Sequence, residues 1–169
     1  MRDPLASRRG IVATTLQILG ERGERSVVDR CDCPRCKRVR SLRRLPPNFR
    51  CADVICDFCG YLAQVKACSV SDVSKPPKEV PGAAWGVQEA RMQAGIFFPL
   101  FIVLISPRGR QAIYYLSADL QPKCMFRPRA PLSNRARRAG WQGFVYDLTQ
   151  VAPGALVCLW KSGARYAAG

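Results

Sequence analysis

Histidine is absent from this chain of 169 residues. Its absence excludes every serine, cysteine or metal site that depends on an imidazole as a base or a ligand. Acidic residues are also scarce: 12 Asp and Glu stand against 27 Lys and Arg, a formal net charge of +15. A site that needs carboxylates therefore has few candidates, and the excess of positive charge favours a polyanion as the partner.

Long apolar segments are missing as well. The most apolar run, residues 96–105, contains Pro99 and is too short to span a bilayer, so we interpret it as a buried central strand. No apolar stretch near the N-terminus leads to a small-residue cleavage site. The sequence therefore predicts no signal peptide and a cytoplasmic protein.

The length is typical of one domain, and hydrophobic residues make up 48% of the chain, as in globular proteins. We expect a single α/β domain over residues 1–169. Apolar spacing predicts a helix over 5–22, ended by Gly20 and Gly23, and composition predicts a second helix over 83–94. Residues 69–82 are expected to form a loop. Strands are expected at 49–56, 61–68, 96–105, 111–117, 144–148 and 155–160.

The nine cysteines include two Cys-x-x-Cys pairs, the knuckles 33–36 and 56–59. Because thiols stay reduced in the cytoplasm, the spacing indicates structural zinc held by Cys33, Cys36, Cys56 and Cys59. The alternative is that these are small buried core residues. Cys31 is a competing ligand, since it forms a Cys-x-Cys with Cys33. The remaining cysteines are interpreted as ordinary strand or core residues: Cys51, Cys68, Cys124 and Cys158.

The expected strands 49–56 and 61–68 flank the second cysteine pair and predict a hairpin with that pair at its tip. Simple antiparallel pairing places Asp53 opposite Gln64, on the face that also carries Lys66. One interpretation is a structural ion pair between Asp53 and Lys66. The other is a divalent-metal phosphodiesterase site, in which carboxylate and amide oxygens bind Mg²⁺ and the ammonium orients or activates the attacking water.

Two arginine-rich segments, 35–50 and 127–138, contain no acidic residue. We expect both to contact phosphates, because the planar guanidinium suits bidentate contacts. The alternative is that the arginine content reflects genomic base composition. Trp141 follows the second segment between Gly140 and Gly143, and we interpret it as a wedge or stacking platform rather than a core aromatic.

The segment Pro131–Gly143 (PLSNRARRAGWQG), followed by Tyr146–Val151 (YDLTQV), resembles the catalytic domain of the Dam-replacing family, the family of the DpnI restriction endonuclease. The two cysteine pairs and the hairpin from Asp53 to Lys66 occur in that family's order. The resemblance covers roughly residues 25–163, and the stretch ARRAGW is its most specific part.

This resemblance implies a PD-(D/E)xK core, the restriction-endonuclease-like α/β fold, that cleaves double-stranded DNA carrying N6-methyladenine in GATC-like sites. The catalytic residues would be Asp53, Gln64 and Lys66, and the structural zinc would sit on the four knuckle cysteines. Magnesium would be held by Asp53, Gln64 and Val65. The residues that would contact DNA are Arg135, Arg137, Arg138 and Trp141.

The chain departs from the family pattern in two ways. Gln64 stands where DpnI-like enzymes carry glutamate, although Mrr-like branches of the superfamily use Gln-x-Lys there. The amide oxygen can ligate a metal but brings no charge, so the alternative function is a catalytically weakened, zinc-containing DNA-binding protein on the same scaffold. A third hypothesis is a zinc-ribbon nucleic-acid adaptor, which the placement of Asp53 and Lys66 disfavours. We also expect no C-terminal winged-helix domain.

Overall fold

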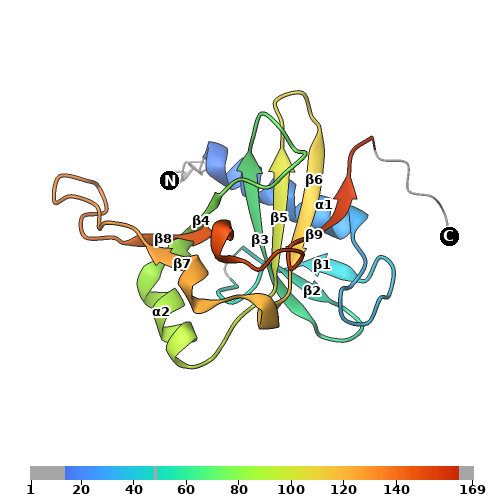
Figure 1. Ribbon diagram of the computed structural model, residues 1–169, viewed down its shortest axis with the longest axis horizontal. Coiled ribbons are helices and arrows are strands. Elements are labelled where there is room, and N and C mark those ends of the chain that lie inside the picture. Colours follow the sequence, from blue (N-terminus) through green and yellow to red (C-terminus); the bar gives the residue numbers. More distant parts are fainter. Residues whose placement is uncertain (1–13, 48, 164–169) are drawn as a thin grey trace, which may run out of the picture.

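A six-stranded sheet forms the centre of the computed structural model, which describes residues 14–47 and 49–163 (Figure 1). Its strand order is β1-β2-β3-β5-β6-β9, and all neighbours are antiparallel except the parallel pair of β3 and β5. The strands are β1 (Leu42–Arg44), β2 (Val54–Cys56), β3 (Leu62–Ser69), β5 (Leu100–Ile105), β6 (Gln111–Leu116) and β9 (Val157–Lys161).

A smaller antiparallel sheet packs against one face of the central sheet. Its strand order is β4-β8-β7, and β4 leads directly into the helix α2. Aromatic residues of β7 and β8 form a core with the alternate side chains of β5 that face them. The elements are β4 (Glu79–Ala84), α2 (Trp85–Gln93), β7 (Phe126–Pro128), β8 (Gly143–Asp147) and the short 3-10 helices Ala118–Leu120, Lys123–Met125 and Leu148–Gln150.

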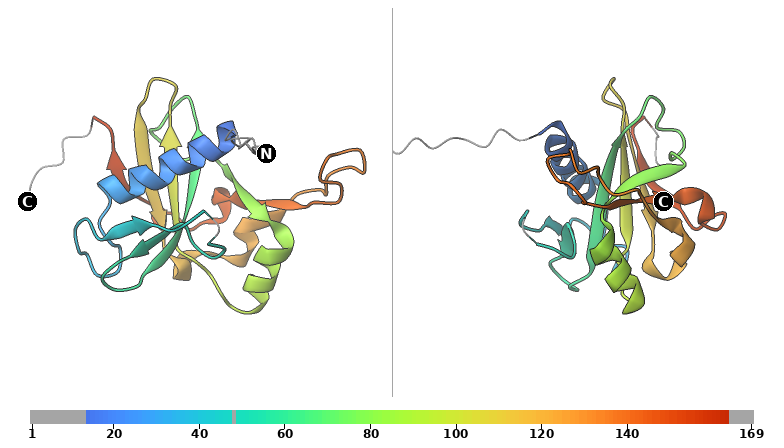
Figure 2. Two further views of the ribbon diagram at one scale, coloured as in Figure 1. Left: turned by 180° about the vertical axis from the view of Figure 1, so that it is seen from behind. Right: turned by 90° about the vertical axis from the view of Figure 1, so that its left-hand side faces the viewer.

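The helix α1 (Thr15–Arg30) covers the opposite face of the central sheet (Figure 2). Val27 of α1 packs in a second core with Phe101 and Val103 of β5. With a layer on each side, β5 is buried at all six positions, because its alternating side chains enter two different cores. The interpretation of this segment as a buried central strand is confirmed. Among the described residues, no helix has the length and apolarity needed to cross a membrane.

The helix α1 ends later than the sequence predicts. Thr14 and Gln17 form a capping box that starts the helix, and residues 5–13 of the predicted helix lie outside the described residues. Gly20 and Gly23 do not end it. A Cβ atom on Gly23 would lie 2.7 Å from the Cβ of Ala67 on β3, so this glycine allows the helix to approach the sheet closely.

Other boundaries also differ from the prediction. The expected loop 69–82 includes the start of β4, which tolerates Pro81 because β4 is an edge strand. Strand β5 begins only at Leu100, after Pro99, and β2 begins only at Val54. The short strand β1 lies in the first arginine-rich segment and β7 overlaps the start of the second, where the residue pattern predicts no strand. The helix expected over 83–94 is confirmed as α2.

Candidate active site

Four cysteine side chains converge where the loop after α1 meets the turn between β2 and β3. The Sγ atoms of Cys33 and Cys59 are 3.6 Å apart, and those of Cys36 and Cys56 are 3.7 Å apart. All four sulfur atoms lie within 4.8 Å of one another. A tetrahedral zinc ion with Zn–S bonds of about 2.3 Å separates its sulfurs by about 3.8 Å. The four thiols are therefore spaced to hold a zinc ion.

Without a bound cation, the thiols of this group differ in pKa. Burial raises the pKa of Cys33 to about 12. Burial also acts to raise the pKa of Cys56, but hydrogen bonding with Ser41 and with backbone N–H groups outweighs it and lowers the pKa to about 6. A bound cation would allow all four groups to be thiolates. Cys31 is buried nearby but does not belong to the convergent group, so the structure does not support it as a competing ligand.

Asp53 lies where β2 stops pairing with β3. Val54 pairs with Ala63, which is the register that the sequence predicts, but the ladder ends one step before Asp53 and Gln64. Instead, the backbone N–H of Asp53 donates to the carbonyl of Ala63, and the Asp53 carboxylate accepts the backbone N–H of Val65 at 2.7 Å. The carboxylate thus replaces the missing strand partner at this edge of β3, which fixes its position.

The hypothesis of a structural ion pair between Asp53 and Lys66 is wrong. Over residues 14–47 and 49–163, these two side chains do not form an ion pair. The ion pairs in that part of the chain join Arg43 to Asp57, Arg44 to Glu24 and Arg127 to Glu79. Three arginines of the two acid-free segments are therefore matched by acids from elsewhere in the chain.

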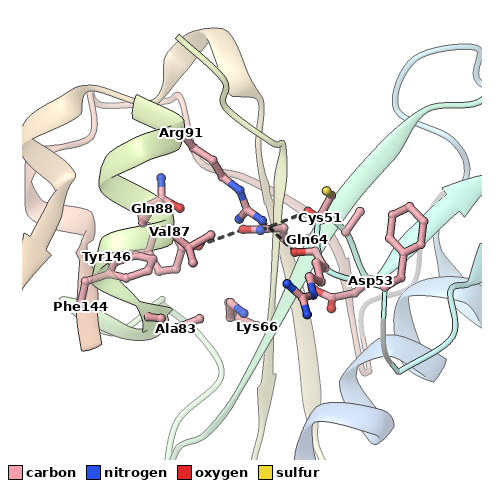
Figure 3. A pocket seen from close by; sticks show the side chains of 14 residues that line it. Cys51, Asp53, Gln64, Lys66, Ala83, Val87, Gln88, Arg91, Phe144 and Tyr146 are labelled. Carbon is pink, nitrogen blue, oxygen red and sulfur yellow. Dashed lines mark hydrogen bonds between the residues drawn. The ribbon is translucent and has the colours of Figure 1, made fainter. Parts of the chain in front are cut away.

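Asp53, Gln64 and Lys66 line one pocket of about 410 Å³ between β3, α2 and β8 (Figure 3). Gln64 and Lys66 share the face of β3 that is turned toward the smaller sheet, because side chains two residues apart in a strand point the same way. All three side chains are partly buried. The structure thus brings together the three side chains that the sequence singles out as catalytic.

Gln64 is held at both ends of its amide. Its Nε2 donates to the backbone carbonyl of Cys51 at 3.3 Å, and its Oε1 accepts the hydroxyl of Tyr146 at 3.0 Å (Figure 3). Tyr146 comes from β8, far from the hairpin in sequence, so the sequence reasoning did not assign it a role. The contact joins the hairpin of β2 and β3 to the smaller sheet.

Arg91 of α2 is a second pocket residue that sequence reasoning missed. Its Nη2 donates to the backbone carbonyl of Arg50 at 2.8 Å, and its guanidinium lies 5.5 Å from the ring centroid of Phe98. The described residues that line the pocket include three cations, Arg50, Lys66 and Arg91, and a single carboxylate, Asp53. The pocket is therefore positively charged and suits an anionic ligand.

A second hollow, of about 380 Å³, adjoins Asp53 on the side of α1. Glu24 of α1 lines it, accepts a hydrogen bond from Nε of Arg44 at 2.9 Å, and forms an ion pair with Nη2 of the same guanidinium at 2.8 Å. Burial raises the pKa of Glu24 despite the opposing effect of Arg44, and the charge of Asp53 raises it further. Sequence reasoning did not single out Glu24. Arg44 serves an internal contact here, so it is not free for phosphates as its basic segment predicts.

The connection between β7 and β8, residues 129–142, projects from the body of the molecule (Figure 1). We call it the arm. Arg135 and Arg137 are exposed on it, and the guanidinium of Arg138 lies 4.7 Å from the ring centroid of Trp141. Trp141 is partly buried because its ring packs over Gly143, where a Cβ atom would lie 2.8 Å from the ring. The arm thus presents arginines and one aromatic together, away from the four convergent cysteines.

A search of curated proteins gave no significant match. The sequence model of the Dam-replacing family, DpnI, matches residues 14–166. This match spans both cysteine pairs, the candidate active site and the arm, and a mixed α/β architecture with four convergent cysteines is consistent with it. The chain therefore belongs to the Dam-replacing (DpnI) family.

Proposed function

We propose that this protein is a zinc-containing, magnesium-dependent endonuclease with a PD-(D/E)xK site, which cleaves double-stranded DNA at adenine-methylated, GATC-like sites. The observation that carries the proposal is the convergence of Asp53, Gln64 and Lys66 on one positively charged pocket. Family membership supports a restriction-type nuclease that acts on methylated DNA. The net charge of +15 supports binding to a polyanion.

The donors around Asp53 fit magnesium, which prefers oxygen ligands. The Asp53 carboxylate, the Gln64 amide oxygen and the backbone carbonyl of Val65 would hold it. When bound, magnesium neutralises charge on the phosphate and lowers the pKa of a coordinated water.

The protein's own cations complete the chemistry. A water oxygen attacks the phosphorus of the DNA backbone, and the bond from phosphorus to the leaving sugar oxygen breaks. The attacking water gives one proton to bulk water, and bulk water protonates the leaving oxygen. Lys66 on β3 would orient the attacking water and stabilise its developing negative charge through its ammonium group, which donates hydrogen bonds but cannot accept a proton. Arg91 faces the same pocket and would stabilise the extra negative charge of the transition state, as a fixed cation does at low cost in reorganisation.

Zinc would have a structural role in this proposal. Cys56 ends β2 and Cys59 lies in the turn before β3, so zinc on these thiols closes the hairpin that carries Asp53. Cys33 and Cys36 tie the same turn to the end of α1. The metal would therefore fix the relative position of Asp53 and Lys66 without taking part in the reaction.

The arm would contact the substrate. Arg135, Arg137 and Arg138 would bind phosphates, and Trp141 would reach into the duplex near the methylated bases. Arginine and an aromatic on a projecting loop are suited to contact a duplex by charge and by insertion between bases.

The substrate class is tested with short duplexes that contain one GATC site, either methylated on both adenines, on one, or on neither. We expect the methylated duplex to be cleaved in Mg²⁺, the unmethylated duplex to be cleaved at least about tenfold more slowly, and EDTA to stop cleavage. Equal cleavage of all duplexes would support a nuclease but contradict the proposed dependence on methylation.

A second candidate function is favoured by the amide at Gln64. A site with a single charged ligand holds a hard cation weakly, which is expected of a zinc-containing protein that has kept DNA binding and lost most of its catalysis. Under this alternative, the duplexes are bound and not cleaved.

Gln64→Glu separates the two candidates. We expect the variant to reach half-maximal cleavage at about tenfold less Mg²⁺, because a second carboxylate joins Asp53. Without metal the variant should be less stable by about 1 kcal/mol, since it loses the donor to the Cys51 carbonyl. Cleavage rates over a Mg²⁺ series and denaturant unfolding in EDTA measure the two effects. Gln93→Glu, which adds the same charge at the exposed end of α2, is the control.

The outcomes of this comparison are distinct. An inert wild type with an active Gln64→Glu variant identifies a decayed nuclease kept for DNA binding. An active wild type that Gln64→Glu inactivates identifies a site adapted to the amide, and contradicts the expected gain in metal affinity.

Trp141→Ala should weaken binding of the methylated duplex by about tenfold, because stacking of one base on an aromatic is worth about 1–3 kcal/mol. Fluorescence anisotropy in Ca²⁺ measures the dissociation constants of both methylation states. The matched control is Trp160→Ala: Trp160 lies on β9, also with an arginine stacked over it, Arg30 at 4.0 Å. A similar loss in both variants would show that Trp141 acts only through the stability of the protein.

A further inference from the structure

The amide of Gln64 is restricted to one orientation. An amide has a donor end and an acceptor end, and both are engaged: Nε2 faces the carbonyl of Cys51 and Oε1 faces the hydroxyl of Tyr146. Rotation of the amide by half a turn would place its oxygen against the Cys51 carbonyl, which can only accept, so this carbonyl selects the orientation of the amide. In that orientation the Tyr146 hydroxyl donates to Oε1 and holds the amide oxygen in place.

The hydroxyl that makes this contact is itself fixed. Tyr146 is 2% exposed, and its ring packs against Phe144 and Phe126 with centroid distances of 4.9 Å and 5.5 Å. A tyrosine hydroxyl is protonated at physiological pH, so this group stays a donor in a rigid part of the core.

We propose that Tyr146 is a positioning residue for the metal site: its hydroxyl holds the Gln64 amide oxygen in the position where this oxygen binds magnesium together with Asp53. The proposal rests on the proposed function. It explains how a neutral side chain serves as a metal ligand at this position. Because glutamine has a donor and an acceptor end, its orientation must be selected, here by the Cys51 carbonyl, and its single oxygen must then be held, here by the Tyr146 hydroxyl; the two oxygens of a glutamate are equivalent.

The contact also links two parts of the chain. Tyr146 lies on β8, the strand that follows the arm, and Gln64 lies on β3 beside Lys66. A single hydrogen bond therefore joins the smaller sheet, which bears the arm, to the strand that carries two of the three candidate catalytic side chains.

Tyr146→Phe removes the hydroxyl and keeps the ring. We expect the variant to bind Mn²⁺, used as the probe for the magnesium site, about fivefold more weakly, as the loss of one hydrogen bond predicts. In protein labelled with ¹⁵N at glutamine side chains, the Gln64 amide signal should shift. The half-saturating Mg²⁺ concentration for cleavage should rise by the same factor as the Mn²⁺ dissociation constant.

Tyr114→Phe is the matched control, because Tyr114 is also buried and its hydroxyl donates to the carbonyl of Ser74 at 2.9 Å, outside the pocket. It should change neither Mn²⁺ binding nor the Gln64 signal. In a Gln64→Ala background, Tyr146→Phe should have no further effect on Mn²⁺ binding. This last comparison separates an effect through Gln64 from a general loss of stability.

An unchanged Gln64 signal together with unchanged Mn²⁺ binding in Tyr146→Phe would overturn the proposal, as would an equal change in Tyr114→Phe. Failure of the proposed function looks different, since the wild type itself then neither binds Mn²⁺ nor cleaves DNA. In that case the Gln64 amide signal still decides whether Tyr146 holds this side chain.

Discussion

Asp53→Asn should abolish DNA cleavage, with a loss in rate of at least about 1,000-fold. Asp53 is the single carboxylate among the described residues that line the pocket, so under the proposed function its charge would be the main attraction for magnesium. Several kcal/mol of transition-state stabilisation would then depend on that metal, and each 1.4 kcal/mol is about tenfold in rate. Single-turnover cleavage of the methylated duplex measures the loss.

The asparagine variant isolates the charge of Asp53. The carboxylate also accepts the backbone N–H of Val65, and an asparagine oxygen can keep that hydrogen bond. Asp53→Ala should also abolish cleavage, and in addition cost about 1–3 kcal/mol of unfolding free energy, since it leaves the Val65 N–H without its partner. Both variants should still bind DNA, or bind it more tightly, because a negative charge near phosphate is removed.

Two further variants complete this test. Lys66→Ala should lower the rate as strongly as the Asp53 variants without loss of DNA binding. Asp72→Asn, at an exposed carboxylate that accepts from Ser74 outside the pocket, should cleave like the wild type. If the Asp53 and Lys66 variants all cut at the wild-type rate, the assignment of the active site is wrong.

Cys59→Ser should remove zinc and inactivate the protein. We expect native mass spectrometry to find one zinc per chain in the wild type and none in the variant, because three thiolates hold the ion much less tightly than four. Loss of the ion would release the turn between β2 and β3 and with it the position of Asp53. The unfolding free energy should fall by several kcal/mol, since metal binding to structural sites is coupled to folding.

The control for the zinc prediction is Cys124→Ser, at an exposed cysteine outside the convergent group, which should keep its zinc and its activity. A wild-type protein that is fully folded and free of metal would contradict the zinc assignment.

The candidate site was predictable from sequence wherever its parts are close along the chain. The spacing within each Cys-x-x-Cys pair and the short separation of the two pairs along the chain predict the convergence of the cysteines. The alternation of side chains predicts that Gln64 and Lys66 share a face. The register of Val54 with Ala63 follows from the same hairpin.

What could not be predicted depends on contacts between distant segments. Tyr146 and Arg91 reach the pocket from β8 and α2, and no periodicity in the sequence indicates which strand of one sheet will face which strand of another. The local sequence predicts a helix end at Gly23, yet the role of this glycine depends on Ala67 of β3, against which the helix packs. The end of the ladder before Asp53 depends on a side chain that takes over a backbone hydrogen bond, which strand propensities do not describe.

Contacts between distant segments also explain why the role of some arginines could not be predicted. Composition predicts that an acid-free segment is free to bind phosphate, but Arg44 and Arg127 are matched by Glu24 and Glu79 from other elements. Arg135 and Arg137 on the arm are exposed. The arm is therefore the part of these segments where the prediction of phosphate contacts still stands.

The most direct test of the proposed function is cleavage of a supercoiled plasmid by the zinc-loaded wild type and Asp53→Asn, side by side. The plasmid is prepared with and without adenine methylation and incubated in Mg²⁺ or in EDTA. We predict nicked and linear products only for the wild type, in Mg²⁺ and predominantly on the methylated plasmid. A plasmid that stays supercoiled with the wild type in Mg²⁺ and in Mn²⁺, or one that Asp53→Asn cuts equally well, would contradict the account.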